Sequence, residues 1–114
     1  MLLDFFVPKY TILNLNVRAI VNKRNLIEIL LKEKEPDIVI FTEHWLKKDE
    51  IDRLTIMDYV IVSNYCRKNG YGGVLIAINK KLQNYVTPID IINNLSVENT
   101  IEIAAIRLNH NKKL

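Results

Sequence analysis

Two polar side chains stand where two apolar runs of this sequence end. Asn16 closes the run Ile-Leu-Asn-Leu-Asn at residues 12–16, and Glu43 follows the run Ile-Val-Ile-Phe-Thr at residues 38–42. One helix-length segment separates the two runs. If the runs are neighbouring parallel strands joined by a helix, the amide and the carboxylate meet at the carboxyl edge of one sheet, where open α/β folds place ligands. A hard divalent cation prefers oxygen ligands of this kind.

Each of these two residues also has an ordinary structural explanation. A glutamate at the end of a strand is more often a cap or a surface charge than a metal ligand. An asparagine readily ends a strand by bonding its own backbone. Their joint placement at one edge strengthens the metal-site interpretation for both residues.

Other kinds of chemistry find less support. His44 follows Glu43, but no His-Glu-x-x-His pattern or cysteine pair supplies further zinc ligands, so we expect His44 to be a structural or outer-shell residue. Gly70, Gly72 and Gly73 precede a strand-like run and no Lys-Ser or Lys-Thr pair follows them, which excludes a P-loop. We expect these glycines to serve geometry, allowing positive φ at the end of a hairpin.

Three cations lie close to these motifs. Arg18 stands two residues after Asn16, and Arg67 and Lys68 precede the glycines. All three could contact the phosphates of a nucleic acid. The alternative for each is a solvated surface cation, which is at least as good an explanation for Lys68 and a poorer one for Arg18.

The elements that must position these residues can be read from periodicity. Residues 10–17 favour a strand, and the apolar spacing of residues 22–35 predicts an amphipathic helix that Asn22 caps and Pro36 ends. Residues 37–42 form a continuous apolar run that suits a strand covered on both faces. Together they predict a βαβ unit whose two strands are parallel, sending Asn16 and Glu43 to the same edge.

The rest of the chain predicts mostly antiparallel strands. We expect a short helix at 47–54, a strand at 59–62, a long hairpin loop at 64–73 and a strand at 74–78. Residues 85–91 can pair only as an edge or interrupted strand because of Pro88, and residues 101–108 alternate as a last strand. No repeat or linker divides the chain, so residues 1–114 are predicted to be one domain or part of one.

Composition sets looser bounds. The 114 residues carry 16 Lys and Arg against 13 Asp and Glu, a formal net charge of +3, which mildly favours polyanionic partners. The single Cys66 cannot form an internal disulfide and favours a reducing compartment. The first eight residues do not resemble a signal peptide, and no stretch approaches the length of a membrane span. We therefore expect an intracellular protein, nuclear or cytoplasmic, without a membrane partner.

Three motifs in order carry a resemblance to a known family: residues 12–18 (ILNLNVR), 36–46 (PDIVIFTEHWL) and 70–78 (GYGGVLIAI). Together the sequence resembles the start of the endonuclease/exonuclease/phosphatase family, particularly the apurinic-endonuclease-like domain that non-LTR retrotransposons encode ahead of their reverse transcriptase. The resemblance extends from about residue 10 to residue 108. Arg18 stands where the apurinic endonucleases proper have an acidic residue, which favours the retrotransposon branch.

The resemblance implies a fold, a reaction and two site residues. The fold would be the amino-terminal half of a two-sheet α/β sandwich, and the reaction would be metal-assisted hydrolysis of a phosphodiester with Mg²⁺ or Mn²⁺. Asn16 would belong to the active site and Glu43 would bind the metal. The water-activating histidine, its aspartate partner, the Asp-x-Asn pair and a catalytic tyrosine would lie beyond this chain, and their roles do not move onto His44, Tyr65 or His110.

The leading hypothesis is thus the amino-terminal portion of a DNA endonuclease from a retrotransposon polyprotein, a poor nuclease alone, whose partners are DNA and either the missing half of the domain or a reverse transcriptase. One alternative is a non-catalytic module that binds nucleic acid. Another is a phosphoesterase of the same fold acting on phospholipids or small phosphate esters. Because a half sandwich lacks its second layer, we also expect Val39, Phe41, Leu75 and Ala77 to be exposed and to cause self-association.

Overall fold

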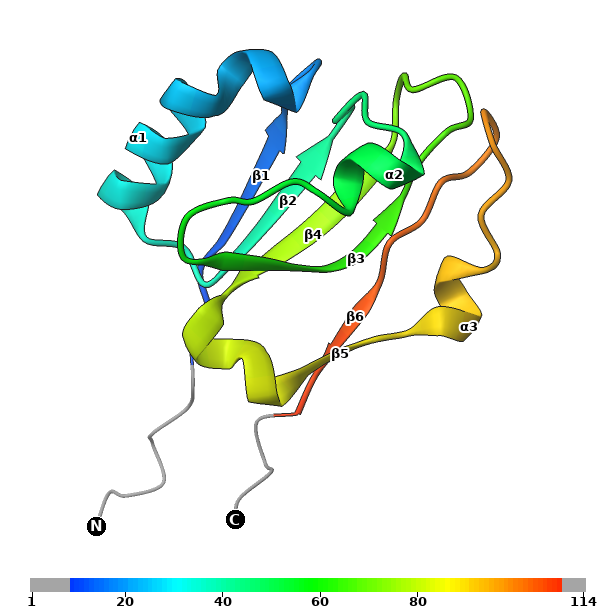
Figure 1. Ribbon diagram of the computed structural model, residues 1–114. Coiled ribbons are helices and arrows are strands. Elements are labelled where there is room, and N and C mark those ends of the chain that lie inside the picture. Colours follow the sequence, from blue (N-terminus) through cyan, green and yellow to red (C-terminus); the bar gives the residue numbers. More distant parts are fainter. Residues whose placement is uncertain (1–8, 110–114) are drawn as a thin grey trace, which may run out of the picture.

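A computed structural model describes residues 9–109. Two points of the sequence analysis lie outside these residues: the absence of a signal peptide in the first eight residues, and His110, to which no catalytic role was given. Figure 1 shows a sheet with helices along it and a second, shorter pair of strands. In chain order the elements are β1 (Ile12–Asn16), η2 (Ile20–Lys23), α1 (Arg24–Lys34), β2 (Ile38–Thr42), α2 (Lys48–Ile51), β3 (Tyr59–Tyr65), β4 (Val74–Asn79), η3 (Lys80–Tyr85), β5 (Val86–Pro88), α3 (Asp90–Asn93) and β6 (Ile106–Leu108).

The main sheet is mixed, as the sequence predicts. Its four strands run in the order β1-β2-β4-β3, and β5 pairs with β6 in a separate sheet. β1 and β2 are parallel, with Asn16 opposite Thr42, whereas β4 pairs antiparallel with both β2 and β3. The crossover through α1 therefore brings the last residues of β1 and β2 to one edge of the sheet.

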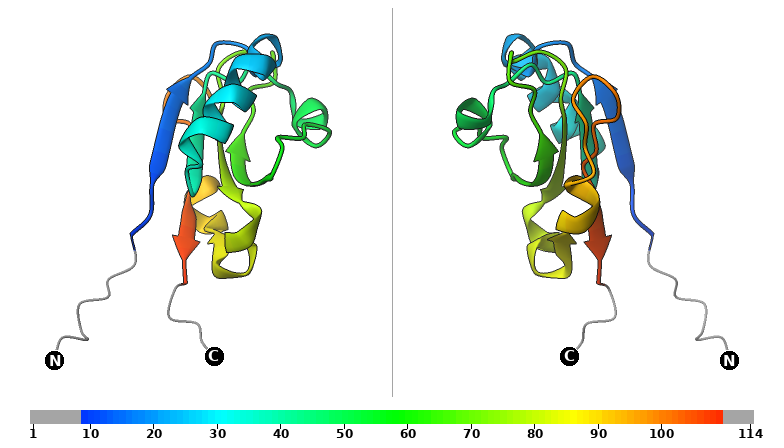
Figure 2. Two further views of the ribbon diagram at one scale, coloured as in Figure 1. Left: turned by 90° about the vertical axis from the view of Figure 1, so that its left-hand side faces the viewer. Right: turned by 90° about the vertical axis from the view of Figure 1, so that its right-hand side faces the viewer.

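One face of this sheet is covered by helices and by the chain between β2 and β3. Ile27 and Leu31 on the inner side of α1 pack in one cluster with Val39 and Phe41 of β2. Leu46, Ile51 and Ile56 complete this cluster from the segment around α2. Figure 2 shows the sheet close to edge-on, with α1 and α2 beside it.

This arrangement corrects the prediction of an exposed apolar face. Val39, Phe41, Leu75 and Ala77 have no exposed surface because α1 and the segment 46–56 cover them. The layer that buries them is made of helices and loops that belong to this chain. The expectation of self-association therefore loses the patch on which it was based.

The other face carries the beginning of a second layer. Ile38, Ile76 and Ile78 pack with Val86 of β5, and partly buried residues of β6 join this cluster. The side chains of β1 that point to this face, Ile12, Asn14 and Asn16, remain exposed. The α/β fold predicted for part of a sandwich is thus confirmed, with a four-stranded mixed sheet and two short strands packed against it.

Several element boundaries differ from those predicted. Asn22 does not cap α1, because a 3₁₀ turn occupies residues 20–23 and the helix begins at Arg24 without a side-chain cap. The helix ends at Lys34, where Glu35 adopts a left-handed φ of 45°. Only residues 106–108 of the predicted last strand are extended in a ladder, while Val97 and Ile101 form an isolated bridge.

Within the described part of the chain, the helices are too short or too polar to cross a bilayer.

Candidate functional site

The side chains of Asn16 and Glu43 meet at the carboxyl edge of β1 and β2. The amide nitrogen Nδ2 of Asn16 donates a hydrogen bond to Oε2 of Glu43 over 2.9 Å. The carbonyl oxygen of the asparagine and the other carboxylate oxygen are left for further partners. The structure thus brings together the two residues that the sequence singled out, one from each parallel strand.

The backbone of Glu43 is held from both sides. Its N–H donates to the carbonyl of Gly73 over 2.7 Å, and its carbonyl accepts from the N–H of Ala19 over 3.0 Å. Glu43 itself adopts a left-handed φ of 57°, which costs a non-glycine residue free energy unless its surroundings enforce it. These two bonds supply that enforcement and set the direction in which the carboxylate leaves the sheet.

Arg18 lies on the same edge beside the carboxylate. Its Nε is 4.0 Å from Oε1 of Glu43, and its side chain is 75% exposed against 40% for the glutamate. Arg18 and Ala19 also have positive φ values, of 44° and 78°. The Nζ of Lys23 donates to the carbonyls of Val17 and Arg18, which fastens this turn. The guanidinium is therefore exposed beside the carboxylate, and phosphate contact by Arg18 stays a prediction.

The glycine turn after β3 contacts the segment that carries Glu43. Gly70, Gly72 and Gly73 have φ values of 79°, 62° and 86°, which confirms the prediction that they serve positive φ. The carbonyl of Gly72 accepts from the N–H of Trp45 over 3.0 Å. The glycine turn thus pairs with the segment that carries Glu43.

His44 is buried directly behind Glu43. Its side chain has no exposed surface, its Nδ1 accepts from the N–H of Leu46 over 3.0 Å, and its Nε2 lies 2.9 Å from the carbonyl of Tyr65. Burial lowers the pKa of His44, although the bond to Tyr65 and the charge of Glu102 oppose this shift. The neutral, fully engaged ring is not placed to activate water, which agrees with the structural role predicted for it.

Arg67 and Lys68 lie in different electrostatic settings. The Nε of Arg67 is 2.6 Å from Oε2 of Glu102, and both side chains are mostly buried. The same glutamate accepts from the N–H groups of Gly73 and Asn99. Arg67 is thus committed to an ion pair that braces the glycine turn, whereas Lys68 is exposed. DNA contact by either residue stays a prediction, with Lys68 the more accessible of the two.

An aromatic pair flanks the site, and sequence analysis did not single it out. The rings of Trp45 and Tyr71 meet edge to face with centroids 5.0 Å apart. Trp45 is 36% exposed and Tyr71 is 55% exposed. The sequence places one of these aromatic residues in each of two motifs, at residues 36–46 and 70–78. That the two rings meet depends on the glycine turn, which the sequence alone did not reveal.

The donor set fits part of a magnesium site. Among residues 9–109 no three histidine, cysteine, aspartate or glutamate side chains gather closely enough to hold a metal ion. Mg²⁺ usually keeps several waters and takes only one or two carboxylates together with substrate phosphates. Glu43, with the carbonyl oxygen of Asn16, would supply that minimum, so the residues present fit a weakly held hard cation and do not fit zinc.

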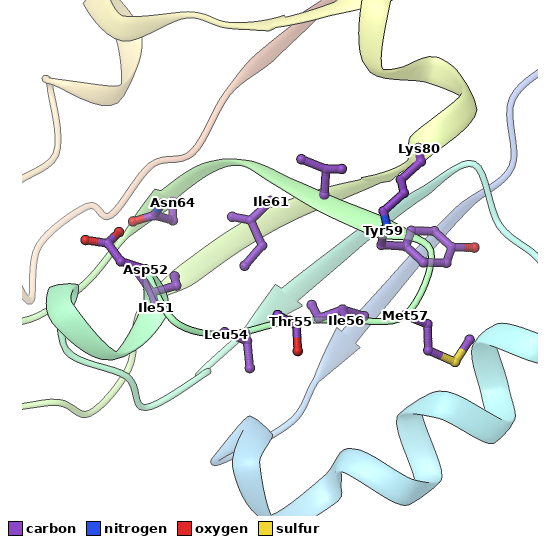
Figure 3. Close-up of a pocket in the computed structure, with 11 residues that line it drawn as sticks. Ile51, Asp52, Leu54, Thr55, Ile56, Met57, Tyr59, Ile61, Asn64 and Lys80 are labelled. Atoms are coloured by element: carbon purple, nitrogen blue, oxygen red, sulfur yellow. The ribbon is translucent and has the colours of Figure 1, made fainter.

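Two pockets show how the site relates to the concave parts of the surface. Figure 3 shows a pocket of about 410 Å³ along β3 and the segment 51–57, which includes neither Asn16 nor Glu43. A second pocket of about 240 Å³ lies between β1 and α1 and is lined by Asn16 and Arg18 as well as by Leu15, Leu26 and Leu30. Because the larger of these two pockets contains neither candidate metal ligand, we assign the site by the chemistry of Asn16 and Glu43 and not by pocket size.

Several solved structures have a fold similar to that of this chain. The chain is similar to the 3′ phosphatase NExo from Neisseria, solved with a product DNA hairpin, at 25% sequence identity and a TM-score of 0.55 over 72% of this chain and 30% of that one. It is also similar to the AP endonuclease LMAP from Leishmania major, at 22% identity and a TM-score of 0.52 over 62% and 24%.

A third similar structure is the catalytic domain of Xenopus laevis APE2, at 22% identity and a TM-score of 0.52 over 68% of this chain and 24% of that one. No family model matches the sequence, and no curated protein matches it significantly. The chain spans less than a third of the length of the three structures. It has the fold of part of a group of nucleases and phosphatases.

Proposed function

We propose that this chain is the amino-terminal portion of a metal-dependent DNA endonuclease domain of the kind encoded by non-LTR retrotransposons. The observation that carries the proposal is the contact between Asn16 and Glu43, which places an amide and a carboxylate side by side at the carboxyl edge of two parallel strands. That edge is where α/β folds bind their ligands. The similarity to a phosphatase solved with a DNA hairpin supports DNA as the substrate class.

Glu43 and Asn16 would hold Mg²⁺ or Mn²⁺ in this proposal. When bound, such an ion polarises a phosphoryl oxygen and stabilises the charge on the leaving oxyanion. Glu43 is suited to this because the bonds of its backbone fix where its carboxylate points. Asn16 orients that carboxylate by donating to Oε2 and keeps its own oxygen free.

Arg18 and Lys68 would bind the DNA backbone. Both are exposed, and Arg18 lies beside the carboxylate, so a phosphate held by its guanidinium would approach Glu43. Such contacts position a duplex without reading its sequence. The retrotransposon origin rests on Arg18, since an arginine after the Asn-Val pair suits that branch of the resemblance.

A specific observation favours a second candidate, a non-catalytic nucleic-acid-binding module. His44 is buried with both ring nitrogens engaged, and no other histidine lies within the described residues. The described residues therefore offer no imidazole base to activate water. This candidate keeps the DNA-binding role of Arg18 and Lys68 and omits the metal.

Two measurements test the proposal together. The first is the anisotropy of a labelled DNA duplex titrated with the chain at increasing salt. We expect Arg18→Gln and Lys68→Gln each to weaken binding and to lower the slope of log Kd against log salt by about one. Lys34→Gln, on an exposed residue at the far end of α1, is the matched control and should leave the slope unchanged.

The second measurement separates the two candidates. Mn²⁺ titration should broaden the amide resonances of residues around Glu43 in the native chain and leave them sharp in Glu43→Gln. Equal broadening in both proteins would contradict the metal site and favour the non-catalytic module. Plasmid nicking with Mg²⁺ should be weak, and strong nicking that Glu43→Gln abolishes would show that the chain already holds a complete site.

A further inference from the structure

The side chain of His44 crosses the start of one strand to reach another. β4 lies between β2 and β3 in the sheet, and His44 follows the end of β2. Its Nε2 nevertheless lies 2.9 Å from the carbonyl of Tyr65, the last residue of β3. The ring must therefore pass over Gly73, the residue that precedes β4.

Gly73 makes this crossing possible. A Cβ atom added to Gly73 would lie 2.4 Å from Nε2 of His44 and 2.9 Å from the carbonyl oxygen of Tyr65, and real Cβ atoms do not approach other atoms so closely. The φ of Gly73 is 86°, which a side chain would also disfavour. Gly73 thus leaves a gap in the turn that the imidazole fills.

The two hydrogen bonds of the ring determine its chemical form. Because Nδ1 accepts the N–H of Leu46, it carries no proton. The carbonyl of Tyr65 can only accept, so Nε2 must carry the proton and donate it. His44 is therefore a neutral imidazole that receives a bond from its own loop and gives one to the far strand.

We propose that His44 is a positioning residue, which sets the direction of the Glu43 carboxylate by tying the loop after β2 to the end of β3 through the gap at Gly73. The inference rests on the proposed function only for the role of the Glu43 carboxylate as a metal ligand. The contacts of His44 themselves involve neither metal nor DNA. Glu43 has a left-handed φ, and its main chain is held by bonds to Ala19 and Gly73. The two ring bonds fix His44, the residue that follows Glu43. The ring also packs against Gly73, whose carbonyl accepts from the N–H of Glu43.

The two ring bonds can be removed separately. In His44→Asn the amide oxygen takes the place of Nδ1 and keeps the bond to Leu46, but the side chain is too short to reach Tyr65. In His44→Gln the amide nitrogen takes the place of Nε2 and keeps the bond to Tyr65. Gly73→Ala closes the gap and displaces the ring. Val86→Ala, in the cluster on the opposite face, is a control for general loss of stability.

The readout is the side-chain amide resonance of Asn16, which reports its hydrogen bond to Glu43 and needs no activity. Its chemical shift in the native chain and in Glu43→Ala defines the bonded and unbonded limits. We expect His44→Asn and Gly73→Ala to move the resonance more than halfway to the unbonded limit. His44→Gln should remain near the native value, and Val86→Ala should lower the Tm without moving the resonance.

A second readout joins this inference to the proposed function. His44→Asn should weaken the binding of Mn²⁺ on the order of tenfold, as the loss of partners behind a metal ligand commonly does, while His44→Gln should change it far less. If Mn²⁺ does not bind and the Asn16 resonance still responds to His44→Asn, the metal-site proposal is wrong and the positioning role stands.

The inference is overturned if His44→Asn keeps the native Asn16 resonance and behaves like Val86→Ala. It is also overturned if Glu43→Ala leaves that resonance unchanged, since the two side chains then do not meet in solution. A variant that does not fold is recognised by collapsed amide dispersion. In that event the test is made on the native protein. Long-range proton–nitrogen correlation of the His44 ring must show a protonated Nε2 and an unprotonated Nδ1, and any other tautomer overturns the inference.

Discussion

Glu43 and His44 are consecutive residues with opposite environments. The side chain of Glu43 is 40% exposed at the edge of the sheet, and that of His44 is fully buried. Residues along a strand point to alternate faces, and the positive φ at Glu43 redirects the chain at this point. One residue is thus available for a ligand while its neighbour secures the loop.

Cys66 provides a test of burial at the residue scale. Desolvation raises the pKa of the Cys66 thiol to about 11, from a reference of 9.0. Because the thiolate is the reactive form, two pKa units imply about 100-fold less of it near pH 8. Because a thiolate becomes more nucleophilic as its pKa rises, which offsets part of this deficit, we expect 5,5′-dithiobis(2-nitrobenzoate) to label the native protein on the order of tenfold more slowly than the urea-unfolded protein, measured by absorbance. Equal rates would contradict the burial of this thiol.

At the scale of elements, the local pattern of the sequence carries much of the fold. The apolar run at residues 38–42 and the three-and-four spacing of Leu26, Ile27, Leu30 and Leu31 correctly predict β2 and α1. Pro36 marks the end of the helix because the residue before a proline avoids helical geometry. These features depend on neighbours in sequence, which is why they can be recognised.

Features that depend on distant contacts could not be predicted in this way. Residues 101–108 alternate like one strand, but only residues 106–108 find a ladder partner, in β5. Ser63 and Asn93 both bind the N–H of Ala105 and thereby hold the chain outside any strand. The partners lie up to 42 residues away, so no local pattern reveals them.

The candidate site likewise contains features that local sequence predicts and features that depend on distant contacts. The meeting of Asn16 and Glu43 could be predicted because each follows a recognisable strand run and the crossover between the two strands is short. The tie from His44 to Tyr65 and the pairing of Trp45 with Tyr71 require β4 to be inserted between β2 and β3. That strand order was not contained in the periodicity of any single segment.

The end of α1 gives a prediction at this scale. Glu35 caps the helix with a left-handed φ of 45°, and its N–H donates to the carbonyl of Leu31. Glycine is favoured at such a position, so we expect Glu35→Gly to raise the free energy of unfolding by about 0.5–1 kcal/mol. Urea unfolding followed by circular dichroism measures this change.

Glu33→Gly is the matched control for this prediction, because residue 33 is exposed inside the same helix. Glycine there should lower the stability by about 1 kcal/mol. A loss of stability in Glu35→Gly as well would show that residue 35 does not hold the left-handed conformation in solution.

At the scale of the whole molecule, one segment fastens the site to the rest of the chain. Glu98 accepts from the hydroxyl of Tyr65 and from the N–H of Lys68. Glu102 accepts from Arg67 and from the N–H of Gly73. Two carboxylates from the chain after α3 therefore brace the end of β3 and the glycine turn.

This bracing predicts an acid-sensitive part of the stability. Burial alone would raise the pKa of Glu102, but the Asn99 N–H and the Arg67 guanidinium outweigh it, so the pKa of Glu102 lies below its reference of 4.5. A lowered pKa stabilises the fold above about pH 4.5, and this contribution is lost as the pH falls through the folded value.

We expect Glu102→Gln to be less stable than the native protein near pH 7 and to approach its stability as the pH falls below 4.5. Urea unfolding across this range measures both proteins. Arg107→Gln, on an exposed residue of β6, serves as the control and should show the native pH dependence. A constant difference between Glu102→Gln and the native protein would mean that this carboxylate does not titrate with folding.

The main chain of residue 43 is held by its bonds to Gly73 and Ala19, and its carboxylate takes no part in those two bonds. A different side chain at this position would leave both of those bonds in place. Substitution of this residue would therefore remove the proposed metal ligand long before it disturbed the architecture. An intact fold would accordingly say little about whether the proposed metal site is intact.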